Sequence, residues 1–173
     1  LRTREFVQWW LAWFKIDPSE QLRAEKKIIS LVLDKIERKG RVMQGVPYIF
    51  DFFLKKEFKI GLATSSPPEL IELVVRMTGI KDVLSAACSA ELLDYGKPHP
   101  QVYLNYAQEL NSHPTACLCF EDSFNGLIAA KAARMKCVVV PAAAELKEEK
   151  WGAADLRLSS LQNFGELHFG LLS

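Results

Sequence analysis

The first forty residues carry the apolar spacing of two amphipathic helices. In residues 3–15, apolar side chains recur every three or four positions, the period of a helix that buries one face. A second helix is predicted from Asp17, an N-cap residue, with Pro18 at the first helical position and Glu20 completing a capping box. The same spacing continues to Gly40, where we expect this helix to end.

A boundary is predicted at residues 40–45, because this stretch has two glycines and a proline follows at position 47. Beyond it, helix-like and strand-like patterns alternate. Helices are expected at residues 46–55, 67–77, 100–110 and 123–135, and short strands at residues 58–63, 83–88, 116–120, 137–140 and 156–158. This alternation is typical of an α/β fold with a parallel, Rossmann-like sheet. We expect a helical unit at residues 1–42 and the α/β unit at residues 43–173.

Composition places the chain among globular proteins and excludes several functions. An apolar content of 49% is enough for a hydrophobic core in 173 residues and argues against disorder. The 22 basic and 21 acidic side chains leave a net charge of +1, too little for binding nucleic acid or an anionic membrane. No apolar run reaches the roughly 18 residues of a membrane span and no basic-then-apolar leader opens the chain. We expect a soluble, cytoplasmic protein.

The cysteines agree with that location. Cys88, Cys117, Cys119 and Cys137 all stand in apolar stretches, and no CxxC pair occurs. We expect buried, reduced thiols rather than disulfides or a zinc site.

Hydroxyl side chains follow the strand predicted at residues 58–63. In an open parallel sheet the ligand site lies beyond the carboxyl ends of the strands, so polar residues there are candidates. Thr64, Ser65 and Ser66 stand at this end, and the next helix, with Ser66 as its cap, would direct free amides at the same place. The segment suits phosphate binding; the alternative is that these hydroxyls only cap the helix.

A lysine stands in a stiff loop before the helix predicted at residues 100–110. Pro98 and Pro100 restrict the backbone after Lys97, so the loop can aim its cation at a ligand. The alternative is a solvated surface charge. If Lys97 is catalytic, we expect Lys97→Ala to lower activity and leave folding unchanged. His99, between the two prolines, is expected to be exposed.

Two acidic residues, Glu121 and Asp122, come directly after the strand predicted at residues 116–120. Adjacent carboxylates at the end of a buried strand repel each other and lose solvation unless a cation compensates. Mg²⁺ takes one or two carboxylates together with waters and phosphate oxygens. The pair therefore predicts a Mg²⁺ site; the alternative is that Asp122 or Ser123 only caps the next helix.

Together, the three strand ends hold the parts of a phosphoryl-transfer site. Hydroxyls can hold phosphoryl oxygens, a lysine can neutralise developing charge, and a metal ion can bridge carboxylate and phosphate. No nucleophile is evident among these residues.

Five segments give the chain a resemblance to a known family, in the family's order and spacing. They are GLATSSP (61–67), YGKPHPQVY (95–103), FEDSFNG (120–126), KAARMKCVVVP (131–141) and LSSL (158–161). The sequence resembles haloacid dehalogenase (HAD) superfamily hydrolases of the β-phosphoglucomutase and sugar-phosphate phosphatase branch, and in particular the 2-deoxyglucose-6-phosphate and hexitol phosphatase group. The resemblance implies an HAD-like α/β core, a partial helical cap domain at residues 1–42, and a small phosphorylated metabolite as substrate.

The resemblance also implies roles for individual residues. Thr64 would be the phosphate-binding hydroxyl, Ser65 would add a contact beside it, and Lys97 would be the lysine of the third family motif. Asp122 would be a Mg²⁺ ligand, with Glu121 beside it. At the start of the cap, Arg2 would reach the substrate.

The family's first motif is missing from this sequence. An apolar strand ending in Asp-x-Asp supplies the family's nucleophile and general acid, and none of the 173 residues forms such a motif. We expect roughly fifty residues to precede the chain, judged from usual domain size, as its own N-terminal segment or as a separate chain. Without them we expect a Mg²⁺-dependent phosphatase that is inactive. The alternatives are a phosphomutase and a non-catalytic regulatory or interaction module.

Overall fold

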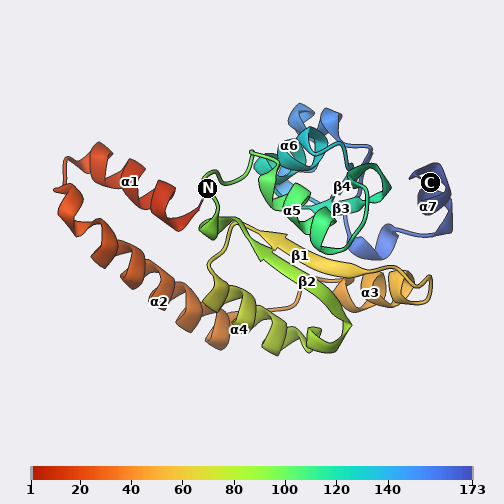
Figure 1. Ribbon diagram of the computed structural model, residues 1–173, viewed down its shortest axis with the longest axis horizontal. Helices are drawn as coiled ribbons and strands as arrows, with labels where there is room; N and C mark the ends of the chain where they lie inside the picture. Colours follow the sequence, from red (N-terminus) through yellow and green to blue (C-terminus); the bar gives the residue numbers. More distant parts are fainter. Residues whose placement is uncertain (1, 173) are drawn as a thin grey trace.

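The computed structural model describes residues 2–172, in which helices and strands alternate after two opening helices (Figure 1). The helices are α1 (Thr3–Phe14), α2 (Gln21–Lys39), α3 (Val46–Leu54), α4 (Pro68–Thr78), α5 (Gln101–Glu109), α6 (Phe124–Ala132) and α7 (Glu166–Leu172). The strands are β1 (Ile60–Thr64), β2 (Leu84–Ser89), β3 (Leu118–Glu121), β4 (Lys136–Val139) and β5 (Leu156–Arg157). Short 3-10 helices connect several of these elements. The predicted α/β alternation is confirmed.

The strands form two parallel sheets. β1 pairs with β2, and β3, β4 and β5 pair in that order. Among the described residues no strand joins β1 to β3, so each of these strands has one edge without a strand partner.

Alternate residues of the central strands face two hydrophobic clusters, because successive side chains of a strand point to opposite faces. Cys137 and Val139 of β4 pack with α5 and α6, in the cluster that includes Val102 and Leu127. On the other face, β4 contributes Val138 to the second cluster, which α3 and the C-terminal residues complete: Ile49, Phe53, Val140, Leu158, Leu161 and Phe164. Helices thus cover both faces of the parallel strands, as the apolar runs of the sequence require.

The opening helices lie to one side of the strands (Figure 1). α1 packs against α2, which in turn contacts α4. Val7 and Leu11 form the buried side of α1, whereas Trp9 and Trp13 stack on each other in solvent. Within residues 2–172, no helix is both long and apolar enough to cross a membrane.

The predicted cap at Asp17 is confirmed: Asp17 accepts from the Ser19 amide and caps the 3-10 turn Pro18–Glu20 that leads directly into α2. Glu20 makes no capping box there. One helix, α7, was not predicted, and one predicted cap is wrong. The N-cap of α4 is Pro67 rather than Ser66. The Ser66 amide donates to Thr64 Oγ1 at 3.1 Å. The helix α7 follows the last strand; its seven residues are too few for a helical period of apolar positions to stand out in the sequence.

Candidate functional site

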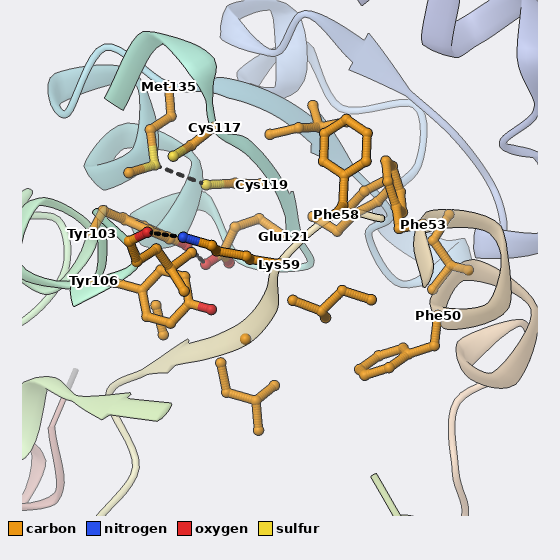
Figure 2. A pocket seen from close by; sticks show the side chains of 18 of the residues that line it. Phe50, Phe53, Phe58, Lys59, Tyr103, Tyr106, Cys117, Cys119, Glu121 and Met135 are labelled. Carbon is orange, nitrogen blue, oxygen red and sulfur yellow. Dashed lines mark hydrogen bonds between the residues drawn. The ribbon is translucent and has the colours of Figure 1, made fainter. Parts of the chain in front are cut away.

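A cavity of about 790 Å³ separates the two sheets (Figure 2). Consecutive residues of β1, Ile60 to Ala63, line one wall, and consecutive residues of β3 and its end, Leu118 to Asp122, line the other. Aromatic side chains supply much of the remaining surface: Phe50, Phe53, Phe58, Tyr103 and Tyr106. We call this cavity the slot. It is bordered by two strand edges whose N–H and C=O groups can accept a further strand.

β1 and β3 run in the same direction along the slot. Their first residues, Ile60 and Leu118, pack against the same hydrophobic cluster. At the other end, Lys97 Nζ lies 2.8 Å from the carbonyl oxygen of Ala63 and 2.5 Å from Glu121 Oε1. The carboxyl ends of both strands therefore meet at Lys97, where the sequence predicted a ligand site.

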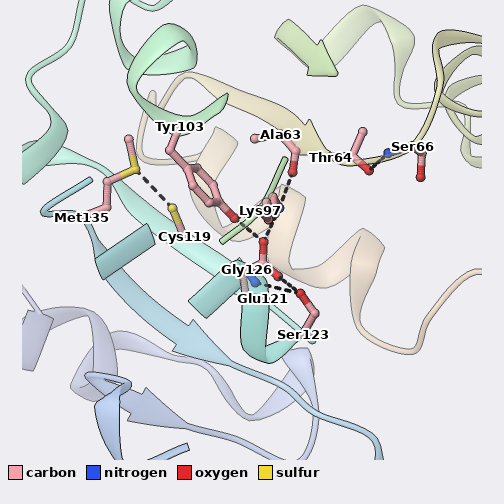
Figure 3. Close-up of polar contacts among 10 residues, drawn as sticks. All are labelled: Ala63, Thr64, Ser66, Lys97, Tyr103, Cys119, Glu121, Ser123, Gly126 and Met135. Carbon is pink, nitrogen blue, oxygen red and sulfur yellow. Dashed lines mark hydrogen bonds and ion pairs between the residues drawn. The ribbon is translucent and has the colours of Figure 1, made fainter. Parts of the chain in front are cut away.

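Lys97 is a buried cation with three partners, not a surface charge (Figure 3). Only 8% of the residue is exposed. Its ammonium donates to Ala63 and Glu121, as above, and to the hydroxyl of Tyr103 at 3.1 Å. An ammonium has three N–H groups, so each finds an acceptor. The loop before α5 thus holds a desolvated charge at the end of two strands.

The two adjacent acids have different surroundings. Glu121 is buried: Oε1 accepts from Lys97 and from the Tyr103 hydroxyl, and Oε2 accepts from Ser123 Oγ at 3.0 Å. Asp122 is exposed, lines the slot, and has no hydrogen bond or ion pair to the described residues. Ser123, not Asp122, caps α6, through the Gly126 amide at 3.0 Å. The carboxylate of Asp122 is therefore free for a cation.

Gly126 lets α6 approach Glu121 closely. A Cβ at this position would lie 1.9 Å from Glu121 Oε2 and 2.1 Å from Glu121 Cδ. No side chain can occupy that space without moving a carboxylate that three other groups hold in place.

We expect Gly126→Ala to lower the free energy of unfolding by roughly 1–3 kcal/mol, because the added methyl group overpacks a buried site. Urea unfolding of the chain measures this loss. The matched control is Gly152→Ala, since nothing lies within 4 Å of a Cβ built at Gly152. Equal stability of the two variants would show that Glu121 moves aside at little cost.

The hydroxyl segment at the end of β1 lies beside Lys97. Thr64 directly follows Ala63, whose carbonyl Lys97 contacts, and the Ser65 hydroxyl is buried with no hydrogen-bond partner among residues 2–172. The helix adds fewer amides than predicted, because Pro67 and Pro68 have no N–H. Phosphate binding at this segment stays a prediction that rests on Thr64 and Ser65.

Arg2 is held by the loop that leads to Lys97. Its guanidinium donates to the Glu5 carboxylate and to the carbonyl oxygens of Leu93 and Asp94, at 2.5 and 3.2 Å. The residue is 4% exposed. These contacts use four of its five N–H groups. A contact with substrate through the remaining one stays a prediction.

His99 and the cysteines are placed as their surroundings dictate. His99 is exposed, as predicted. All four cysteines are free thiols; Cys119 and Cys137 are buried, whereas Cys88 and Cys117 are half-buried, so the predicted burial holds for two of them. Burial raises the pKa of Cys137 to about 12, which makes it a poor nucleophile at neutral pH.

Tyr103 is the site residue that sequence reasoning missed. It stands six residues after Lys97, at the end of the segment YGKPHPQVY, to which the sequence analysis gave no role beyond the family resemblance. Its hydroxyl contacts both Lys97 and Glu121. The sequence did offer a signal for this role. A buried tyrosyl hydroxyl usually has a polar partner, so a tyrosine in a helix beside a strand end could have been predicted to contact the site.

Comparisons with known proteins identify the family of this chain. A family model for haloacid dehalogenase-like hydrolases matches residues 4–134. The chain is 40% identical over 144 residues to hexitol phosphatase B of Escherichia coli (strain K12), a match covering 83% of this chain and 64% of that protein. It is 31% identical over 140 residues to a probable pseudouridine-5'-phosphatase of Drosophila melanogaster, covering 78% of this chain and 60% of that protein.

A solved structure shows the same fold. β-Phosphoglucomutase from Clostridium difficile superposes with a TM-score of 0.85 at 21% identity, covering 99% of this chain and 77% of that one. The chain belongs to the haloacid dehalogenase-like hydrolases. It spans less than two thirds of the length of either phosphatase above.

Proposed function

We propose that this chain forms most of a Mg²⁺-dependent phosphatase that acts on small phosphorylated sugars or related metabolites. The observation that carries the proposal is the buried ammonium of Lys97 at the shared end of β1 and β3. The ammonium lies between the carbonyl of Ala63, the neighbour of Thr64, and the carboxylate of Glu121, the neighbour of Asp122. Similarity to hexitol phosphatase B supports the substrate class.

Thr64, Ser65 and Lys97 would act on the phosphoryl group. The hydroxyls of Thr64 and Ser65 would donate to its oxygens, and the Ser65 hydroxyl has no hydrogen bond to another described residue that it would have to break. Lys97 would stabilise the charge that spreads over the oxygens during transfer, an effect that is strong where water is excluded. Arg2, with residues 1–42 as a partial cap, would contact the rest of the substrate.

The charges at the site fit Mg²⁺. Glu121 already neutralises Lys97, so a phosphate dianion needs further positive charge here. Asp122 offers a free carboxylate beside it, and Mg²⁺ needs only one or two of these besides water and phosphate oxygens. Glu121 is less suited as a ligand, because both its oxygens accept hydrogen bonds already. When bound, the ion would stabilise charge on the phosphate. The described residues contain no group of three or more His, Cys, Asp or Glu side chains that could hold a metal, so other ligands must come from elsewhere.

The slot would receive the strand that carries the nucleophile. A strand between β1 and β3 would satisfy both open edges and join the two sheets into one. If it runs parallel to them, its carboxyl end lies at Lys97 and Asp122. A family-type Asp-x-Asp at that end would bring both missing carboxylates to the phosphate.

With that strand in place, the reaction would proceed in two steps. The first aspartate forms a bond to phosphorus as the bond to the sugar oxygen breaks, and the leaving oxygen takes a proton from the second aspartate. Water then gives a proton to the second aspartate and attacks the phosphorus of the aspartyl-phosphate. The bond to the first aspartate breaks, which releases inorganic phosphate and restores both aspartates to their starting forms.

A panel assay tests the proposal. The full-length protein, with its N-terminal segment, should release inorganic phosphate from phosphorylated sugars only when Mg²⁺ is present. Isomerised sugar phosphate without phosphate release would identify a mutase instead. No turnover of any substrate, with the strand in place, would favour a non-catalytic module.

We expect Asp122→Asn in the full-length protein to reduce turnover by about tenfold or more at limiting Mg²⁺, because a neutral amide binds the ion more weakly than a carboxylate. Its stability should stay within about 0.5 kcal/mol of wild type, since Asp122 is exposed. Titrating Mg²⁺ against initial rate measures the effect, with Asp34→Asn as a control on the exposed face of α2. An unchanged Mg²⁺ dependence would remove Asp122 from the metal site.

A further inference from the structure

Tyr103 touches both halves of the Lys97–Glu121 pair and has no part in the reaction described above. The Tyr103 hydroxyl accepts a hydrogen bond from Lys97 Nζ at 3.1 Å and donates its own proton to Glu121 Oε1 (Figure 3). Its ring lies beside the same ammonium, 4.7 Å from Nζ to the ring centroid. Only 5% of the residue is exposed.

The local backbone holds Tyr103 and Lys97 as one unit. The His99 amide donates to Gly96 across the loop at 3.0 Å, and the Tyr103 amide donates to the Pro100 carbonyl at 2.9 Å in the first turn of α5. Tyr103 therefore reaches back from the helix to the lysine that precedes it. Burial, together with the negative charge of Glu121, raises the pKa of Tyr103, which keeps its hydroxyl protonated and able to donate.

Removing the hydroxyl would leave two groups of the site short of a partner. Lys97 would keep Ala63 and Glu121 but lose the acceptor for its third N–H. Glu121 Oε1 would lose one of its two donors. A buried ammonium with an unpaired N–H rotates or draws in water, because an unsatisfied buried donor is costly.

We propose that Tyr103 is a positioning residue, whose hydroxyl fixes the ammonium of Lys97 against Glu121, in the place from which its positive charge acts on the phosphoryl group. This inference rests on the proposed phosphatase function. Tyr103 acts through Lys97 and does not bind substrate, so its loss should lower turnover and leave substrate binding unchanged.

The first test is Tyr103→Phe in the full-length protein, which keeps the ring and removes only the hydroxyl. We expect kcat to fall about tenfold with KM unchanged, the size of one lost hydrogen bond to a charged group. The matched control is Tyr48→Phe, which removes a hydroxyl bonded to the Phe164 carbonyl at 2.7 Å, away from Lys97. Wild-type kcat in Tyr103→Phe, or a rise in KM alone, would overturn the inference.

The second test needs no activity. NMR of ¹⁵N-lysine-labelled protein measures how fast the Lys97 ammonium protons exchange with water. We expect exchange at least tenfold faster in Tyr103→Phe than in wild type or Tyr48→Phe. Equal rates in all three would overturn the inference. If the full-length wild type proves inactive, the proposed function fails, and this measurement alone decides the role of Tyr103.

Discussion

Lys97→Met should abolish nearly all phosphatase activity of the full-length protein, with kcat reduced a hundredfold or more. Methionine keeps much of the side-chain length and removes the charge. Initial rates with a phosphorylated sugar measure the loss. Lys97→Arg should recover little, because a planar guanidinium cannot replace a compact ammonium held by three acceptors.

The burial of Lys97 adds an effect that its sequence context did not predict. The expectation that Lys97→Ala leaves folding unchanged conflicts with the buried ion pair to Glu121. Removing one partner of such a pair leaves the other charge uncompensated, at a cost of about 3–5 kcal/mol. Lys97→Met should therefore also unfold at lower urea concentration than wild type.

A double variant separates the two effects. Lys97→Met with Glu121→Gln removes both charges, so stability should return toward wild type while activity stays lost. Lys147→Ala, at an exposed lysine, serves as the surface control. If the stable double variant turned over substrate at the wild-type rate, Lys97 would have a structural role only.

The 173-residue chain by itself should show no phosphatase activity, and joining it to a segment that carries the Asp-x-Asp strand should give Mg²⁺-dependent hydrolysis. The reason is that no Asp-x-Asp occurs in the chain, so the nucleophile that the family motif supplies is absent from the slot. Assays of the purified chain and of the full-length protein with a generic phosphate ester compare the two directly.

Filling the slot should stabilise the fold as well as supply the nucleophile. A strand between β1 and β3 would pair both open edges and cover the aromatic lining. The full-length protein carrying asparagine at the first aspartate of the added motif should be inactive but more stable than the chain alone. Turnover by the purified chain would place the nucleophile among the described residues and refute the role of the slot.

The sequence by itself determined the order of helices and strands, because apolar periodicity is a local property of the chain. All five predicted strands lie within two residues of the observed bounds at each end. Local chemistry also located the candidate segments at Thr64, Lys97 and Glu121, since polar residues after apolar runs mark strand ends. The family followed from the same segments.

Only the tertiary structure decided how these groups act on each other. Lys97 is 34 residues from Ala63 and 24 from Glu121, so their contacts depend on how separate strands pack, which no local pattern encodes. Packing buried Lys97, placed Glu121 in the interior and Asp122 at the surface, and brought Tyr103 into contact with Lys97 and Glu121. The slot between β1 and β3 was also visible only in the tertiary structure. Which strands pair is decided by contacts between distant parts of the chain, so the sequence pattern did not show that these two edges lack a partner.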